Sequence, residues 1–167
     1  LELLWRDVSI VLTGDIGRSF VHDVSAVSLI AARFPATLEL ALVAMVMAVC
    51  AGLPLGLVAA MRPRSWLARL ALGYSAVGFS VPTYWFALMG IFIFFFKFRI
   101  APPQMGRIGL EAVPPPDITG SYFVDSLVAA NWTAAISSGQ RLVLPVLIFS
   151  VIVAAPIIKH TRAIALE

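Results

Sequence analysis

Residues 71–96 read ALGYSAVGFSVPTYWFALMGIFIFFF, an apolar run of 26 residues that contains no charged side chain. As an α-helix it would be about 39 Å long, enough to cross a hydrocarbon core of about 30 Å with some tilt. Ser80, Pro82, Thr83 and Tyr84 interrupt the run near its middle. Because a membrane span needs no proline and no hydroxyl group, the run predicts a transmembrane helix with a bend or a polar surface at this place.

The composition of the whole chain is typical of a membrane protein. Hydrophobic residues make up 60% and charged residues 13% of the 167 positions. Soluble domains have about 45–50% and about 25%. In such a protein the basic residues mostly set the orientation in the lipid bilayer, so the net charge of +3 does not indicate nucleic acid. The predicted fold class is all-α, a polytopic membrane protein with three transmembrane helices, surface amphipathic helices and a long outer loop.

Two further apolar runs predict the other transmembrane helices, at residues 34–60 and 142–163. The loop between the first two helices, residues 61–70, carries three arginines and no acidic residue. By the positive-inside rule this loop faces the cytoplasm. The helix at 71–96 then runs outward, and the third helix returns to the cytoplasm, where it ends among basic residues.

The remaining segments are more polar. Residues 1–33 carry apolar side chains at helical spacing between polar ones, which predicts an outer amphipathic helix followed by a loop. Residues 97–141 contain two proline clusters and predict a periplasmic or extracellular loop, with a surface helix within residues 122–138. Since the chain starts at a leucine and stops inside a predicted helix, we expect one domain that is truncated at both ends.

Several residues within the spans are functional candidates. Glu39 lies in the first turns of its helix, where a carboxylate can reach water or a polar neighbour. Gly52, Pro54, Gly56 and Pro82 are candidates for helix bends or hinges. The translocation-pathway candidates are Ser80, Thr83 and Tyr84, although serine and threonine in a span also bond back to their own helix and proline can serve only to bend it.

The sequence contains no pattern that indicates catalysis. There is no phosphate-binding GxxxxGK[ST] loop, no HExxH zinc motif and no GxSxG nucleophile motif. His22 and His160 are far apart and have no cysteine or carboxylate partner at ligand spacing. We therefore expect no catalytic residue, no metal and no cofactor in this chain. The spans with prolines, small residues and hydroxyl groups favour a conduit for solutes.

Short blocks along the chain occur in the order of a known family. The matching blocks are GDIGRS (residues 14–19), RFPATL (33–38), GLPLG (52–56) followed by SWL (65–67), SVPTYW (80–85), TGSY (119–122) with Asp125, Ser126 and Trp132, LVLP (142–145) and TRAIALE (161–167). The first four resemble the family patterns GDLGxS, RxPxTL, GIPLG and SIPSFW. By this ordered set, which covers nearly the whole chain, the chain resembles the inner-membrane permease of bacterial ABC importers for oligopeptides, dipeptides and nickel.

The resemblance implies ATP-driven import by alternating access, in which this chain forms half of the translocation pathway for peptides, or for nickel or related small solutes. The implied partners are a homologous second permease, two cytoplasmic ATPase subunits that bind ATP and Mg, and an extracytoplasmic substrate-binding protein. The implied location is the bacterial inner membrane, with several crossings. The contact with the ATPase is implied to lie beyond Glu167.

Two other classes of function remain open. An ATP-independent channel or secondary transporter would need coupling ions or charges inside the spans, where Glu39 alone is available. A non-transporting membrane scaffold subunit would need no hydroxyl groups or proline at mid-membrane. Copurification separates the three classes, because an ABC permease brings two ATPase subunits and a sister permease with it.

Overall fold

The computed structural model describes residues 17–19, 23–103 and 105–167. Its elements are α2 (Ala26–Met61), α3 (Trp66–Ser80), α4 (Thr83–Ile91), the π-helix η1 (Phe92–Lys97), α5 (Tyr122–Val128) and α6 (Trp132–Ile164). In these ranges the only β-type pairing is an isolated antiparallel bridge between Arg18 and Ser25. The predicted all-α fold class is confirmed. The amphipathic helix predicted near the start of the chain falls within residues 1–16, outside the described residues.

Two of the helices, α2 and α6, are long and apolar enough to cross a membrane. The pair formed by α3 and the α4–η1 rod passes the same test together, with a bend of 108° at the short break between them. The described chain therefore contains two spanning helices, or three if the bent pair counts as one. It is a multi-pass all-α membrane protein.

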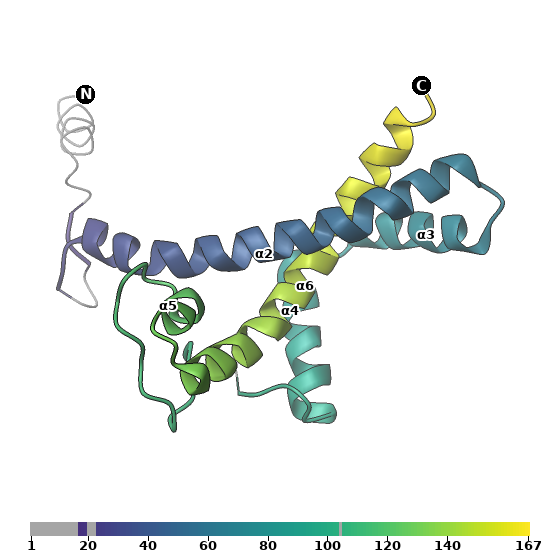
Figure 1. Ribbon diagram of the computed structural model, residues 1–167. Helices are drawn as coiled ribbons and strands as arrows, with labels where there is room; N and C mark the ends of the chain where they lie inside the picture. Colours follow the sequence, from purple (N-terminus) through teal and green to yellow (C-terminus); the bar gives the residue numbers. More distant parts are fainter. Residues whose placement is uncertain (1–16, 20–22, 104) are drawn as a thin grey trace, which may run out of the picture.

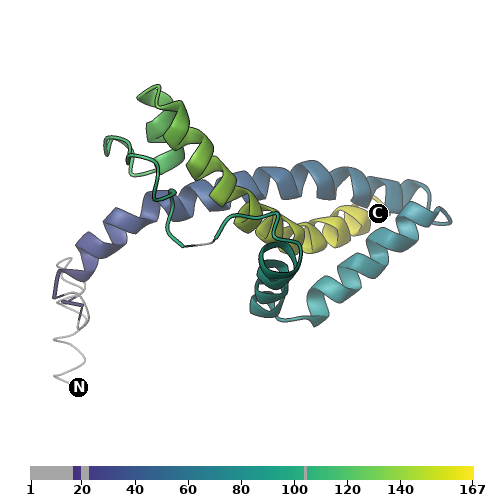
Figure 2. The same ribbon diagram turned by 90° about the horizontal axis from the view of Figure 1, so that it is seen from below.

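Helix α6 is the centre of the arrangement, since it packs against α2, α3, α4 and α5. In Figure 1, α2 and α6 run in the same general direction and cross, while α3 returns beside them and α4 turns away. The view from below shows the C-terminal half of α6 between α2 and α3 (Figure 2). The C-terminal ends of α2 and α6 thus lie at the same end of the molecule.

Small residues allow α2 to approach α6 closely. Every fourth position along α2 carries a buried alanine or glycine: Ala44, Ala48, Gly52, Gly56 and Ala60. A Cβ atom on Gly52 would lie 2.8 Å from Ile157 Cγ2, and one on Gly56 would lie 2.6 Å from Thr161 Cβ. In a membrane, where lipid is as apolar as leucine, such close packing is a main source of helix association.

The ends of several helices differ from those predicted. Helix α2 begins at Ala26 and passes through Pro35, whereas the sequence predicted a start near residue 34. The residues before Pro35 are mostly alanine, leucine, isoleucine and arginine, which favour or tolerate helix, so they extend it. The predicted surface helix at 122–138 is divided at Ala130 (φ 52°), and α6 starts where Asn131 Oδ1 accepts a hydrogen bond from Ala134 N at 3.1 Å.

Candidate functional site

The apolar run at 71–96 is broken between α3 and α4. Val81 has extended backbone (φ −104°, ψ 132°), and Pro82 does as well (φ −60°, ψ 136°). Proline has no N–H to donate, and its ring disfavours helical geometry in the residue before it. The sequence predicted one helix with a bend here. The structure shows two helices instead, because two successive residues leave the helical region.

Thr83, at the start of α4, lines a cavity of about 340 Å³ between α2, α4 and α6. The cavity is lined by Leu40, Thr83, Ala87, Ile91, Leu144, Pro145, Ile148, Phe149 and Ile152. Thr83 carries the only hydroxyl group in this lining. Tyr84 is 70% exposed and does not line it. The side chain of Ser80 lies outside the described residues. Of these residues only Thr83 is shown to line the cavity, and the pathway role of all three stays a prediction.

The bend candidates in α2 lie in an unbroken helix. Pro54 is inside α2, which continues to Met61. Gly52 and Gly56 are buried against α6, where no larger side chain fits without movement. The structure thus gives the two glycines a packing role against α6. Whether they also act as hinges stays a prediction.

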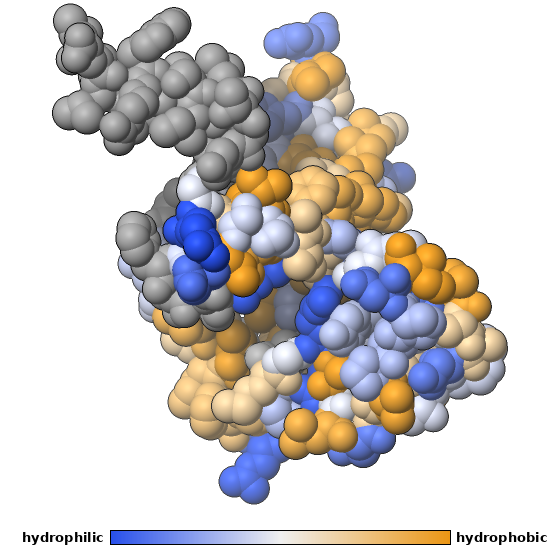
Figure 3. All heavy atoms as spheres, turned by 90° about the vertical axis from the view of Figure 1, so that its left-hand side faces the viewer, coloured by the Kyte–Doolittle hydropathy of each residue, from blue (hydrophilic) through white to orange (hydrophobic). Residues whose placement is uncertain are grey.

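A second cavity, of about 360 Å³, was not predicted. We call it the polar cavity because three charged side chains are among the residues that line it. It is lined by Ala36, Thr37, Glu39, Leu40, Gly106, Arg107, Tyr122, Phe123, Ser138, Arg141, Leu142 and Pro145. Leu40 and Pro145 line both cavities, so the polar cavity adjoins the apolar one. Seen from the α5 side, the surface is hollowed near its centre and carries hydrophilic residues at the edge of the hollow (Figure 3).

Three charged residues line the polar cavity. Glu39 comes from α2, Arg107 from the long loop and Arg141 from α6. In the described part of the chain, Glu39 Oε1 is buried and has no hydrogen-bond partner. The only ion pair within 4.0 Å among the described residues is Arg18–Asp23, at 3.6 Å, so neither arginine pairs directly with Glu39.

The two arginines are held in place by backbone carbonyl groups. Arg107 Nη1 donates to Gly120 O at 2.8 Å, and its guanidinium lies 4.1 Å from the centre of the Tyr122 ring. Arg141 Nη1 donates to the carbonyl oxygens of Pro103 and of Met105, the latter at 3.1 Å. These hydrogen bonds engage one nitrogen of each guanidinium, which has five N–H donors in all. Each arginine can therefore hold the loop and still bind a ligand.

Asp125 anchors the loop segment that leads into α5. Its carboxylate accepts hydrogen bonds from Thr119 N at 2.8 Å, Thr119 Oγ1 at 2.6 Å, Gly120 N at 3.1 Å and Ile118 N at 3.3 Å. Burial by itself would raise the pKa of Asp125, but these hydrogen bonds outweigh it and hold the pKa below its ordinary value. Asp125 therefore fixes Gly120, whose carbonyl group holds Arg107.

Comparison with known proteins gives the chain a family. The profile of the binding-protein-dependent transport system inner membrane component matches residues 52–167, more than half of the chain. The chain belongs to this family of membrane permeases. It is 32% identical over 98% of its length to the probable D,D-dipeptide transport system permease protein DdpB of Escherichia coli (strain K12), of which it covers 48%.

Other relatives of the permease have similar names. The dipeptide transport system permease protein DppB of Haemophilus influenzae is 31% identical over 94% of the chain, with 46% of the relative covered. The peptide transport system permease protein SapB of Salmonella typhimurium is 31% identical over 80% of the chain, with 42% covered. The chain thus spans about half the length of these curated relatives. No solved structure matches it.

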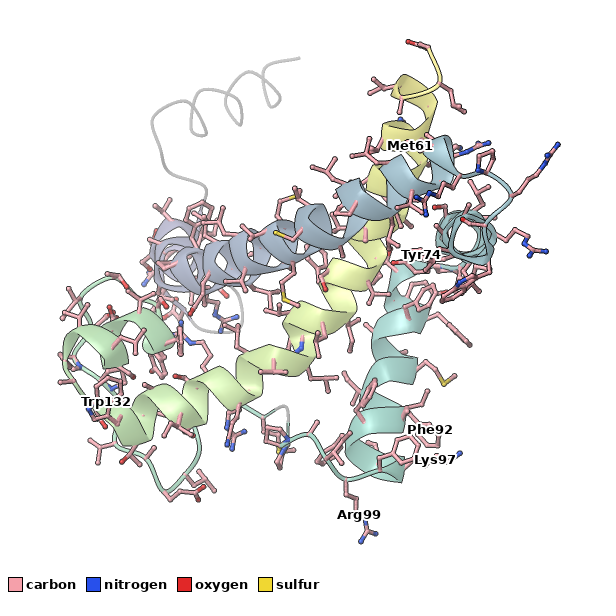
Figure 4. All side chains as sticks on the ribbon, turned by 45° about the vertical axis from the view of Figure 1, so that its right-hand side comes forward. Met61, Tyr74, Phe92, Lys97, Arg99 and Trp132 are labelled. Atoms are coloured by element: carbon pink, nitrogen blue, oxygen red, sulfur yellow. The ribbon has the colours of Figure 1, made fainter. Side chains whose placement is uncertain are left out.

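The permease has a basic end opposite the polar cavity. Ala59 from α2, Ala68 and Ala71 from α3, and Ile158 from α6 form one buried cluster. The cluster brings the loop after Met61 beside the C-terminal end of α6. Basic residues lie in this loop, in the first turn of α3 and near the end of α6: Arg62, Arg64, Arg69, Lys159 and Arg162. Figure 4 shows Met61 at this end, with Trp132 and Arg99 toward the other.

The sequence did not predict the polar cavity because the charged residues that line it are far apart in the chain. Glu39 was predicted to need water or a polar neighbour, but Arg107 and Arg141 follow it at large and irregular separations. Arg107 lies in a loop whose path depends on hydrogen bonds to Asp125. The local signal that could have been used was Glu39 itself, because an acidic residue in an apolar helix generally has a partner or a function.

Proposed function

We propose that this permease forms half of the translocation pathway of an ATP-driven importer of small peptides and works by alternating access. The observation that carries the proposal is the pair of adjoining cavities, one charged and one apolar, between α2, α4 and α6. A solute that enters the polar cavity would next meet the apolar cavity, which lies beside the helix break at Pro82. The names of the relatives support peptides as the solute.

The proposed partners are a homologous second permease, two cytoplasmic ATPase subunits and an extracytoplasmic substrate-binding protein. ATP and Mg bind to the ATPase subunits, whose closure moves the helices, and hydrolysis resets them. The proposed orientation in the bacterial inner membrane places the basic end in the cytoplasm. The basic residues after α2 and those in α6 lie at the same end of the molecule, which supports this orientation. The proposed orientation puts the polar cavity at the outer side of the membrane.

Copurification of the full-length permease tests this assembly. Affinity purification in mild detergent from the native membrane is expected to bring down a second permease and two ATPase subunits in a constant ratio. ATP hydrolysis by the purified complex should be inhibited by vanadate. Recovery of the full-length permease without any ATPase would favour an ATP-independent channel or a scaffold and would contradict the proposal.

The pathway candidates can be tested by chemical labelling of the assembled importer. In a Cys50→Ser background, cysteine at Thr83 or Ser80 is expected to react with a membrane-impermeant thiol reagent, and dialanine should slow the reaction. The matched control is cysteine at Leu57, on the exposed apolar face of α2. If Thr83→Cys and Ser80→Cys react no faster than Leu57→Cys, the two residues do not line a water-filled pathway.

A further inference from the structure

Most hydroxyl groups of the polar cavity already have partners within the protein. Ser138 Oγ donates to Ala134 O at 2.8 Å, and Thr37 Oγ1 donates to Arg33 O at 3.3 Å. The groups that remain for a ligand are the Tyr122 hydroxyl, the carboxylate of Glu39 and the uncommitted nitrogens of Arg107 and Arg141. The cavity therefore offers one strong acceptor and two strong donors.

The unpartnered oxygen of Glu39 is the observation that points to a ligand. A buried carboxylate oxygen without a hydrogen bond is costly, so such a group generally has a partner, which is a protein group, an ordered water or a bound ligand. The two arginines line the same cavity but make no ion pair with Glu39, and they are held by carbonyl groups of the loop. Opposite charges are thus kept apart across a shared space.

We propose that this cavity binds a small zwitterionic peptide, with the α-ammonium on Glu39 and the α-carboxylate on Arg107 and Arg141. The inference rests on the proposed function and adds the groups by which the permease itself recognises its substrate. A volume of about 360 Å³ is near the lower end of the range for small-molecule sites, roughly 300–1,000 Å³. An extended dipeptide spans only about 7 Å, so two or three residues suit the cavity better than a long peptide.

Recognition of both termini has a clear chemical logic. All unmodified peptides carry an ammonium group and a carboxylate, whatever their side chains are. Arginine binds carboxylates through paired N–H donors, and a carboxylate accepts from an ammonium. The adjoining apolar cavity, lined by Leu40, Pro145 and Ile148 among others, would accept side chains without selecting among them.

Binding measurements on the assembled importer test the proposal. The full-length permease, with its sister permease and ATPases in nanodiscs but without the substrate-binding protein, would be titrated with dialanine, N-acetyl-dialanine and dialanine amide. The wild type is expected to bind dialanine at least about tenfold more tightly than either blocked peptide, as the loss of one charge-assisted hydrogen bond predicts. Equal affinity for the three peptides would overturn the proposal and needs no variant.

Substitutions then assign each terminus to its residue. Glu39→Gln should bind dialanine and N-acetyl-dialanine equally while still preferring dialanine to the amide. Arg141→Gln should do the reverse, with a reduced preference for the free carboxylate. The matched control is Asp117→Asn. Asp117 is an exposed acid in the loop that carries Arg107, and it does not line the cavity, so this variant should keep both preferences. A Glu39→Gln importer that still prefers the free ammonium would overturn the assignment.

Failure of this site is distinguishable from failure of the proposed function. ATP-dependent uptake of dialanine by the complete importer, together with no preference for free termini in the nanodisc assay, would overturn the site and leave peptide import standing. The absence of ATP-dependent uptake of any peptide would contradict the proposed function and this inference with it.

Discussion

Replacing Gly56 with leucine is expected to push α2 away from α6 and to destabilise the permease by at least about 1–3 kcal/mol, the usual cost of overpacking a tight contact. A Cβ atom at this position would lie 2.6 Å from Thr161 Cβ and 3.0 Å from Ile158 O. Both atoms belong to or adjoin the backbone of α6, so they cannot move aside without moving the helix. The remaining atoms of leucine would make the clash worse.

A thermal melt of the full-length permease in detergent measures this effect, and a second glycine provides the matched control. Gly73 on α3 has no atom within 4 Å of the position that a Cβ would take. Gly73→Ala should therefore leave the melting temperature unchanged or raise it, because alanine favours a helix by roughly 1 kcal/mol over glycine. A Gly56→Leu permease that melts like the wild type would show that α2 and α6 do not pack as described.

Replacing Asp125 with asparagine is expected to loosen the loop segment before α5 and to cost about 2–3 kcal/mol. The buried carboxylate accepts four hydrogen bonds from Ile118, Thr119 and Gly120. Asparagine has the same shape but presents an amide NH₂ in place of one oxygen, so at least one buried N–H is left without an acceptor. Hydrogen exchange of the amides of residues 118–120 should become faster, whereas the exposed Asp117→Asn should have little effect.

The pH dependence of this effect follows from the direction of the pKa shift. Hydrogen bonds hold the pKa of Asp125 in the folded protein below the ordinary value of 3.8. Its contribution to stability is therefore complete above the ordinary value and is lost as the pH falls through the lowered one. The difference in melting temperature between wild type and Asp125→Asn should be constant near neutrality and narrow below about pH 4. A difference that widens in acid would contradict the assigned hydrogen bonds.

Composition predicted the fold class and the long apolar helices because membrane spans are selected by length and hydropathy, which local sequence contains. Helix ends were harder to predict. Helix α6 starts at Trp132 rather than near residue 142 because Asn131 caps it, and polar residues such as Ser138 are accommodated by bonding to their own helix. A hydropathy window ignores both effects and so placed the start of this helix ten residues too late.

The helix break at Pro82 and the polar cavity could not be predicted from hydropathy, because each depends on contacts between parts of the chain. Proline at position 82 predicted a disturbance, but whether a helix bends or stops depends on the residue before it and on what packs nearby. Here Gly78 and Gly90 both lie against α6, at Ala155 and Ile148. The polar cavity depends on the path of the long loop that carries Arg107. This path is set by contacts that no periodic sequence pattern reveals.

Uptake by the complete importer tests the central claim most directly. Proteoliposomes that contain the full-length permease, its sister permease and the ATPases would be given labelled dialanine, the substrate-binding protein and ATP. We predict accumulation of dialanine that requires ATP hydrolysis, stops with vanadate and is strongly reduced in the Glu39→Gln importer. Accumulation that proceeds equally without ATP, or no transport of any small peptide by the assembled complex, would contradict the account.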